Sequence, residues 1–305
     1  MKILVSLTSF CEYDMSPYEM LVNAGYDVVQ NHFKRKLINT EIIKLGHDVV
    51  GIIAGTEKLD KDVIGRLNNL KVISRCGVGL DNVDISAANN RGIKVLNTPH
   101  GPTNAVAELT VGLIFGLLRQ IPQMDRLIRV GKWEKRMGSQ VKGKNIGIVG
   151  YGRIGQKVGE LLHGFGAEIA YCDNVVNNHP IGTQLCLPEI CSWSDILCLH
   201  LSPSSTNMPI IGKNELSLMK KGTWIVNCSR GGVIDEAVLY DMLKNNDLAG
   251  AALDVFKDEP YYGSLTELDN VILTPHIGSY ARESRIEMEI NAVCNLINAL
   301  KDIKR

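Results

Sequence analysis

Three glycines at positions 150, 152 and 155 form the feature that most limits what this chain can fold into. They follow a strand-like run of branched apolar residues over 145–149 and open a helical pattern over 154–165. Glycines at these spacings permit a tight turn between strand and helix and let a ligand approach the backbone closely. The motif alone is common, but its place between a strand and a helix predicts a Rossmann βαβ unit.

An acidic residue follows at the distance that such a unit requires. The next strand-like run ends at Cys172, and Asp173 comes 23 residues after Gly150. A carboxylate in this position accepts hydrogen bonds from the ribose hydroxyl groups of a dinucleotide and repels a 2′-phosphate. The predicted cofactor is therefore NAD rather than NADP, with its pyrophosphate at the N-terminus of the following helix.

Short β-branched runs alternate with helical patterns along most of the chain. Five strand-like runs precede residue 97, and a second series of six begins at Asn145. Alternation of this kind is typical of α/β folds with parallel sheets. We therefore predict an α/β protein with two doubly wound parallel-sheet domains, and we expect the active site in the cleft between them. The expected strands are 2–7, 27–29, 48–53, 71–74, 93–96, 145–149, 168–171, 196–200, 223–227, 249–253 and 271–273.

Several helices have distinct signals. The run Ser16-Pro17-Tyr18-Glu19 predicts a capping box with proline at the first helical position, and Gly25 is expected to end that helix. A long pattern over 103–118 is apolar on most faces, so that helix is expected to be buried. The stretch 129–141 is polar and irregular, and a last helix is expected over 281–299.

The charge balance limits the partners. Lys and Arg total 33, as do Asp and Glu, and this balance argues against nucleic acid or an anionic membrane as the main partner. No apolar run reaches the length of about 18 residues that a transmembrane helix needs. The N-terminus does not resemble a signal peptide, so we expect a cytoplasmic protein. The eight cysteines include no CxxC pair and no zinc-ligand spacing, so we expect buried, reduced thiols and no metal.

Three polar segments each follow a strand of the second series, over 227–235, 254–260 and 274–278. Because the carboxyl ends of parallel strands meet at one edge of a sheet, Arg230, Glu259 and His276 are expected to converge beside the nicotinamide. Taken singly, each has an ordinary structural explanation. Taken together, beside a dinucleotide motif, they predict an active site.

These segments resemble D-isomer-specific 2-hydroxyacid dehydrogenases and, within that family, the D-3-phosphoglycerate dehydrogenases. The similarity runs over essentially the whole chain. It includes the segments 75–84, 97–99, 107–108, 119–123 and 131–134. The resemblance implies a flavodoxin-like substrate domain, built from residues 1–98 and 277–305, around an NAD-binding Rossmann domain of residues 99–276. It also implies a homodimer formed through the NAD domain, and a short form without the regulatory C-terminal domains of longer members.

The resemblance assigns catalytic roles to the convergent residues. His276 would protonate the keto oxygen as hydride arrives and take the proton back in oxidation, which suits a side chain that changes charge near neutral pH. Glu259 would hydrogen-bond the imidazole, orient it and favour its charged form. Arg230 would bind the substrate carboxylate with its planar guanidinium and polarise the carbonyl.

The resemblance also implies contacts for the cofactor and the substrate. Asp254 would contact the nicotinamide carboxamide. Gly77 and Gly79 would let the backbone N–H groups of Val78 and Gly79 approach the substrate carboxylate. Arg75 and Arg136 are candidates for a substrate phosphate, Arg136 from near the subunit interface. The other expected NAD contacts are Gly150, Gly152, Arg153, Ile154, Gly155, Asp173, His200, Cys228, His276 and Gly278.

The sequence is compatible with more than one substrate. The preferred pair is 3-phosphoglycerate and 3-phosphohydroxypyruvate, which would place the protein in serine biosynthesis. The alternative is a reductase of hydroxypyruvate, glyoxylate or another 2-keto acid, because the basic stretch 132–136 also fits a solvated patch. A different class is an NAD-sensing corepressor-like binding protein, since such relatives keep the Arg, Glu and His. The chain departs from the usual family pattern at Asn174 and Ser202, where proline is common.

Overall fold

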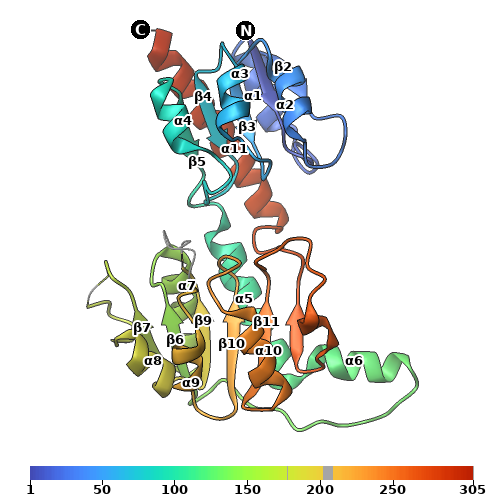
Figure 1. Ribbon diagram of the computed structural model, residues 1–305, viewed down its shortest axis with the longest axis vertical. Helices are drawn as coiled ribbons and strands as arrows, with labels where there is room; N and C mark the ends of the chain where they lie inside the picture. Colours follow the sequence, from blue (N-terminus) through green and yellow to red (C-terminus); the bar gives the residue numbers. More distant parts are fainter. Residues whose placement is uncertain (177, 202–208, 305) are drawn as a thin grey trace. The chain divides into compact units, whose positions relative to one another are not determined.

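The computed structural model describes residues 1–176, 178–201 and 209–304. Ser202, one of the departures from the family pattern, lies outside them. The chain divides into two compact units (Figure 1). Unit 1 consists of Met1–Pro102 together with the segment from Ser279 onward, and unit 2 is Thr103–Gly278. Which unit binds substrate and which binds cofactor stays a prediction.

Unit 1 is built on a five-stranded sheet in the order β2-β1-β3-β4-β5, with every pair parallel. The strands are β1 (Lys2–Val5), β2 (Asp27–Gln30), β3 (Val49–Ala54), β4 (Val72–Arg75) and β5 (Lys94–Asn97). The helices are α1 (Ser16–Asn23), α2 (Asn39–Gly46), α3 (Lys61–Arg66), α4 (Ile85–Asn90) and α11 (Arg282–Lys304).

The C-terminal helix α11 completes the core of unit 1 (Figure 1). Its buried Leu296 packs against Gly51 of β3, where an added Cβ would lie only 3.0 Å from the leucine side chain. The buried Ser74 hydroxyl donates to the Ala292 carbonyl at 2.8 Å, and Asn295 donates to the Asn97 carbonyl at 3.0 Å. The two ends of the chain therefore fold together around one sheet.

Unit 2 is built on a seven-stranded parallel sheet in the order β12-β11-β10-β9-β6-β7-β8. The strand order reverses between β9 and β6, which makes their carboxyl ends the switch point of the sheet. The strands are β6 (Asn145–Val149), β7 (Glu168–Cys172), β8 (Thr183–Gln184), β9 (Ile196–Leu199), β10 (Thr223–Asn227), β11 (Leu248–Leu253) and β12 (Val271–Leu273).

Helices cover both faces of this sheet. One face packs against α5 (Pro102–Arg119) and α7 (Arg153–Gly164), and the other against α8 (Leu187–Trp193), α9 (Lys213–Ser217) and α10 (Glu236–Lys244). The connections also contain α6 (Ile121–Arg129) and the 3-10 helix η1 (Ser264–Glu267). Two doubly wound parallel sheets confirm the predicted fold class.

The predicted strands are present, and one predicted helix start is wrong. The structure also has elements that we did not predict, among them β8, α6 and η1. The predicted capping box at Ser16 is wrong. Met15 is the N-cap residue, and the Ser16 N–H donates to the Asp14 carboxylate at 2.7 Å, so Asp14 takes the role expected of the serine. Gly25 does end the helix, with φ +80° and its N–H bonded to the Val22 carbonyl.

The long helix α5 is largely buried, as predicted, with Ala107 and Ile114 fully inaccessible. Among the described residues no single helix is long and apolar enough to span a membrane. Helices α5 and α6 reach that length and composition only as a pair, across a 62° bend at Gln120.

The cysteines carry no disulfide, since all eight are free. Four of them are buried: Cys76, Cys191, Cys198 and Cys228. Cys11, Cys172 and Cys294 are only partly buried and Cys186 is exposed, so the expectation of buried thiols fails most clearly at Cys186. It caps the short helix α8, whose first residues face solvent.

Candidate functional site

The carboxyl edge of the seven-stranded sheet brings together most of the predicted site residues. The loops that leave successive strands at this edge carry the glycine motif after β6, Asp173 after β7 and His200 after β9. The neighbouring strands supply Arg230 after β10, Asp254 after β11 and His276 after β12. Residues far apart in the sequence thus lie along one edge, because all of these strands are parallel members of the same sheet.

The glycine loop has the geometry that a phosphate-binding turn requires. Gly150 has φ +89°, and a Cβ there would overlap the carbonyl group of His200. A Cβ on Gly155 would overlap the Gly150 carbonyl oxygen. Gly152 differs, since a Cβ there would meet nothing within 4 Å. It is the N-cap of α7 and gives the helix no side-chain cap, so there is space beside Gly152 at the start of the helix, which suits a pyrophosphate.

Asp173 is tied to the glycine loop. Its carboxylate accepts the Tyr151 N–H at 2.7 Å through one oxygen, and the N–H groups of Val175 and Val176 at 2.7 and 3.0 Å through the other. Burial opposes ionisation of this carboxyl, but the three backbone donors outweigh it and lower its pKa. The carboxylate is therefore charged at neutral pH, and it fixes the glycine loop to the end of β7. The sequence indicated a ribose contact but not this second function.

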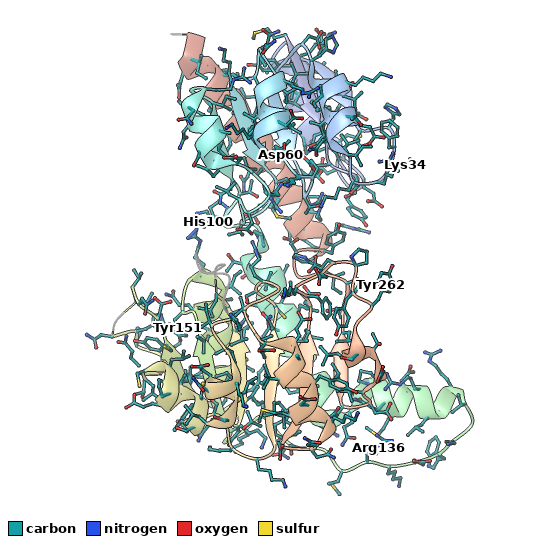
Figure 2. The ribbon with its side chains drawn as sticks, in the orientation of Figure 1. Lys34, Asp60, His100, Arg136, Tyr151 and Tyr262 are labelled. Atoms are coloured by element: carbon teal, nitrogen blue, oxygen red, sulfur yellow. The ribbon has the colours of Figure 1, made fainter. Side chains whose placement is uncertain are left out.

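Tyr151 extends the same connection into the core (Figure 2). Its ring stacks on Tyr171 at 4.2 Å, and its hydroxyl donates to the Ile181 carbonyl at 2.9 Å. A Cβ on Gly159 of α7 would meet this hydroxyl at 2.6 Å, so the helix needs glycine there. Tyr151, which stands between the first two glycines of the motif, therefore packs the turn against the core.

His200 stands across the switch point from the glycine loop. Its backbone N–H donates to the Val149 carbonyl at 2.8 Å, which places it beside Gly150. Both ring nitrogens are buried and have no hydrogen-bond partner within the described part of the chain. Burial lowers the pKa of His200 to about 4, so the ring is neutral at pH 7 and offers one donor and one acceptor.

His276 and Glu259 form the closest pair of titratable side chains at this edge. The imidazole Nδ1 of His276 lies 2.9 Å from Glu259 Oε2, while Glu259 Oε1 accepts the Phe256 N–H at 3.1 Å. His276 has φ +55°, a left-handed conformation that non-glycine residues seldom adopt. Both side chains are partly exposed, at 46% and 37%. Since Nδ1 faces the carboxylate, Nε2 is the nitrogen left to exchange a proton.

Asp254 holds the turn that carries His276. It is buried, and one carboxylate oxygen accepts the Thr274 hydroxyl at 2.6 Å and the Ile277 N–H at 2.8 Å. The other oxygen accepts the Gly278 N–H at 2.8 Å. The predicted contact with the nicotinamide stays a prediction. What the structure adds is a clamp that maintains the strained turn at His276.

Arg230 lies in a loop shaped by Asn227. The buried Asn227 side chain donates to the Arg230 carbonyl at 3.0 Å and accepts from the Ser229 N–H and hydroxyl at 3.0 and 2.7 Å. A Cβ on Gly231 would overlap the Phe256 carbonyl, so this loop packs directly against the loop that leads to Glu259. In the same loop, burial raises the pKa of the Cys228 thiol to about 12, which keeps it protonated.

Three of the predicted substrate residues belong to unit 1. Arg75 ends β4, and Val78 and Gly79 lie in the loop that follows it. Gly77 has φ +144°, and its N–H donates to Thr98 Oγ1 at 2.7 Å, which anchors the loop to the end of β5. Among the described residues, the N–H groups of Val78 and Gly79 have no acceptor. That arrangement suits an anion, as predicted for a substrate carboxylate.

Arg136 is exposed in the irregular segment after α6. Within unit 2, Figure 2 shows it at the opposite end from Tyr151 of the glycine loop. Arg136 is therefore away from the glycine loop of the same chain.

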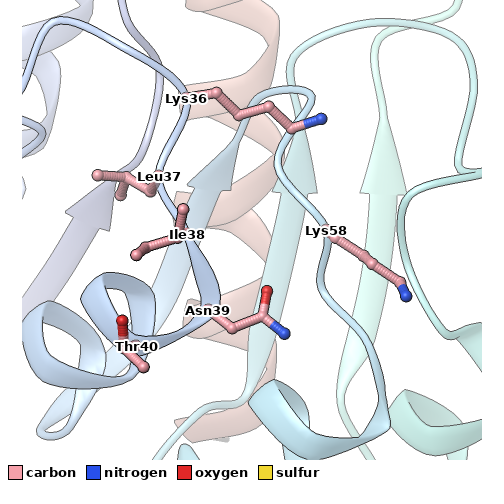
Figure 3. Close-up of a pocket in the computed structure, with 6 residues that line it drawn as sticks. All are labelled: Lys36, Leu37, Ile38, Asn39, Thr40 and Lys58. Atoms are coloured by element: carbon pink, nitrogen blue, oxygen red, sulfur yellow. The ribbon is translucent and has the colours of Figure 1, made fainter. Parts of the chain in front are cut away.

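A separate hollow in unit 1 holds none of the predicted residues (Figure 3). It measures about 500 Å³ and is lined by the connection from Lys36 to Thr40 and by Lys58. Lys58 lies 3.8 Å from the Asp60 carboxylate, which also accepts from Asn39 at 2.9 Å. Within the described residues no group of three His, Cys, Asp or Glu side chains could hold a metal ion.

Comparison with known proteins agrees with this architecture. Residues 111–278 match the model of the D-isomer specific 2-hydroxyacid dehydrogenase, NAD binding domain. The chain therefore belongs to the D-isomer-specific 2-hydroxyacid dehydrogenases, a family of NAD-binding enzymes.

Particular relatives narrow the comparison. A D-3-phosphoglycerate dehydrogenase of Methanocaldococcus jannaschii is 41% identical over 246 residues, which cover 78% of this chain and 47% of the relative. The chain thus spans about half the length of that protein. A glyoxylate reductase of Thermococcus litoralis is 39% identical over 256 residues, covering 79% and 77% of the two chains. The solved TT0316 protein of Thermus thermophilus superposes with a TM-score of 0.91 at 32% identity, over 99% of this chain and 97% of that one.

Proposed function

We propose that the chain is an NAD-dependent dehydrogenase that interconverts a small D-2-hydroxy acid and its 2-keto acid. The observation that carries the proposal is the pair His276–Glu259, with Nδ1 and Oε2 2.9 Å apart, at the sheet edge that also carries the glycine loop. A histidine held by a carboxylate is suited to deliver a proton, and the neighbouring loop is suited to a dinucleotide.

The residues present fit NAD. The space beside Gly152 at the start of α7 suits the pyrophosphate, and the charged Asp173 suits an unphosphorylated ribose. Arg153, Ile154 and Gly155 follow in the same turn, and His200 offers two unused ring nitrogens beside it. Asp254, Cys228 and Gly278 are assigned to the nicotinamide end. When bound, the cofactor supplies or accepts the hydride.

The chain itself handles the proton and the substrate charge. In reduction, His276 Nε2 gives its proton to the keto oxygen as the carbonyl carbon receives hydride, and in oxidation it takes the proton back. Glu259 holds the imidazole at Nδ1 and orients it. Arg230 binds the substrate carboxylate, as a guanidinium matches two carboxylate oxygens. The N–H groups of Val78 and Gly79 are assigned to the same carboxylate.

We propose 3-phosphoglycerate and 3-phosphohydroxypyruvate as the substrate pair. Support comes from the several relatives named D-3-phosphoglycerate dehydrogenase and from Arg75, which is assigned to the phosphate. Arg136 is assigned to the same phosphate, but from a second copy of the chain. The competing candidate, a glyoxylate or hydroxypyruvate reductase, is supported by the Thermococcus litoralis relative, of which this chain covers 77%.

A homodimer through unit 2 is part of the proposal. The segment from α6 to residue 140 exposes Val130, Trp133 and Met137, which are apolar and, at 70%, 82% and 93% exposure, uncovered. Light scattering after size-exclusion chromatography would give a mass of twice 33.6 kDa. A single-chain mass would contradict the dimer and the assignment of Arg136.

The test is oxidation of NADH by the purified protein with phosphohydroxypyruvate, hydroxypyruvate, glyoxylate and pyruvate measured side by side. A clear preference for phosphohydroxypyruvate supports the phosphoglycerate reading. If the protein reduces only the unphosphorylated acids, it is a general 2-keto-acid reductase. Tight NADH binding without turnover of any of the four leaves either another 2-keto acid as the substrate or an NAD-sensing binding protein. A wider panel of 2-keto acids decides between them, and no turnover across it contradicts the dehydrogenase proposal.

A further inference from the structure

The five-stranded sheet of unit 1 has a switch point of its own. Its order, β2-β1-β3-β4-β5, reverses between β1 and β3. In doubly wound sheets, ligands bind beyond the carboxyl ends of the strands at such a point. The predicted substrate residues Val78 and Gly79 follow β4, the strand next to β3. The loops that leave β1 and β3 have no assigned contact with the substrate.

Arg285, in the first turn of α11, lies beyond the carboxyl end of β1. Its Nη2 donates to the Ser9 hydroxyl at 3.3 Å, and Ser9 comes four residues after the end of β1. The adjacent Ser284 donates to the carbonyl of Gly101, four residues after the end of β5. The start of α11 therefore crosses the carboxyl edge of this sheet and places Arg285 at its switch point.

A buried ion pair fixes the guanidinium of Arg285. Its Nη2 lies 3.0 Å from Oε1 of Glu289, four residues further along α11, and the two side chains are 12% and 5% exposed. The other oxygen of Glu289 accepts the Cys11 N–H at 2.9 Å, and Cys11 has a left-handed backbone with φ +59°. The pair therefore ties the loop after β1 to α11 and leaves the arginine little conformational freedom.

The rest of this guanidinium is unused. Both of its hydrogen bonds, to Ser9 and to Glu289, come from Nη2. Within the described residues, Nε and Nη1 of Arg285 have no hydrogen-bond partner, yet neither atom is sealed from solvent. Three N–H donors of a fixed and weakly hydrated cation thus remain available at the switch point. Such an edge of a guanidinium matches two oxygens of a phosphate or a carboxylate.

Arg285 also lies close to the loop that is assigned to the substrate. Burial raises the pKa of the Cys76 thiol, at the start of that loop, to about 11, and the charges of Arg285 and Arg75 both oppose the rise. Besides the paired glutamate, the carboxylate that acts on this thiol is Glu57, which is 2% exposed and accepts the Gly55 N–H at 2.9 Å. The carboxylates are thus enclosed by the fold, whereas part of Arg285 is accessible.

We propose that Arg285 is a specificity-determining residue that binds the phosphate on carbon 3 of the substrate through Nε and Nη1. The inference rests on the proposed function, which assigns the substrate carboxylate to the N–H groups of Val78 and Gly79. Neighbouring strands are about 4.8 Å apart, so the gap between β1 and β3 lies roughly 7 Å from β4. The far end of a three-carbon phosphate ester reaches across that interval.

The test compares phosphohydroxypyruvate with hydroxypyruvate, which differ only in the phosphate. Arg285→Gln should lower kcat/KM for phosphohydroxypyruvate by about 10- to 100-fold, the loss expected for hydrogen bonds to a charged group. It should affect hydroxypyruvate much less. Arg282→Gln is the matched control, because Arg282 is an exposed arginine of the same turn whose guanidinium lies over the Tyr13 ring. It should keep the wild-type ratio. Equal losses for both acids in Arg285→Gln would overturn the inference.

A second variant guards against a folding defect. Arg285→Gln leaves Glu289 buried without its cation, which destabilises a protein strongly. The double variant Arg285→Gln/Glu289→Gln removes both charges, and it should lose the preference for the phosphorylated acid as the single variant does. A double variant that folds and keeps the wild-type preference would overturn the inference.

Binding of inorganic phosphate separates this inference from the proposed function. Calorimetric titration should show a saturable phosphate site in the wild type and in Arg282→Gln that is absent from both Arg285 variants. That result supports the role of Arg285 even if none of the four acids is reduced. A wild type without a phosphate site, or the same site in every variant, overturns it whatever the protein reduces.

Discussion

Asp254 accepts hydrogen bonds from both the side chain of Thr274 and the backbone of Gly278, so a single buried carboxylate spans the turn that carries His276. The backbone of His276 has a left-handed conformation. Asp254 fixes the turn around it, and Glu259 fixes its ring. The first prediction concerns the clamp. Asp254→Asn replaces one accepting oxygen by an NH₂ group that faces an N–H donor. We expect kcat to fall at least about tenfold, because a buried donor without a partner costs about 1–3 kcal/mol.

Thr274→Val is the matched control for Asp254→Asn. It removes one of the three hydrogen bonds and leaves both backbone donors paired, so its effect on kcat should be the smaller. Steady-state kinetics with separate KM values for NADH and keto acid would measure both. An Asp254→Asn enzyme with unchanged kcat and a changed KM for NADH alone would contradict the clamp and support a cofactor contact only.

The contact between Gly231 and Phe256 predicts a severe loop substitution. Gly231→Ala places a methyl group on the Phe256 carbonyl, and the loops that carry Arg230 and Glu259 must separate. Activity should fall by roughly 10²-fold or more, as misplacement of a catalytic group by about 1 Å is enough for that loss. Gly112→Ala in α5 is the matched control, because nothing lies within 4 Å of its Cβ. It should be neutral or slightly stabilising. Equal activities of the two variants would refute the argument.

Asp173 is expected to govern the choice of dinucleotide. Asp173→Ala removes the charge that repels a 2′-phosphate and one hydrogen bond to the ribose, which together are worth about 10- to 100-fold. The ratio of kcat/KM for NADH to that for NADPH should fall by this amount. Because Asp173 also holds the Tyr151 N–H, affinity for both cofactors should decrease. An unchanged ratio would mean that residues other than Asp173 select between NADH and NADPH.

His200 predicts a pH dependence of stability. Its pKa is lowered to about 4 in the folded chain, so an unfolded chain binds a proton here at a higher pH than the folded one does. The stabilisation is complete above the ordinary histidine pKa of about 6.5, and it is lost as the pH falls toward 4. Urea unfolding of the wild type and of His200→Leu at pH 7 and pH 5 would reveal it. The variant should lose less stability over that interval, and equal losses would contradict a buried neutral ring.

The parts of the fold that could be predicted from sequence are those with a local signal. Glycines at fixed spacing, β-branched runs and the polar residues after strands Thr223–Asn227 and Val271–Leu273 are local features, and the structure has them where expected. Strand β8 has only Thr183 and Gln184, both exposed, so it has no hydrophobic pattern to detect. Helix α6 did carry a signal in Pro122 and in the Asp125–Arg129 pair, which lie at helical spacing.

Less of the candidate site than of the fold could be predicted from the sequence. That His276, Glu259 and Arg230 follow strands of one sheet could be inferred from order alone. The hydrogen bonds of Asp254 to residues 274–278 could not, because they depend on β11 and β12 being neighbours. The same holds for Asn227, whose buried side chain shapes the Arg230 loop.

The central claim is that His276 carries the proton at a site that binds NADH. The most direct measurement compares wild type and His276→Ala for reduction of phosphohydroxypyruvate, with NADH affinity determined separately by fluorescence. Turnover should fall by roughly 10²–10⁴-fold, the usual contribution of a general acid, while NADH affinity is retained. A His276→Ala protein that binds NADH and keeps full turnover would contradict the account.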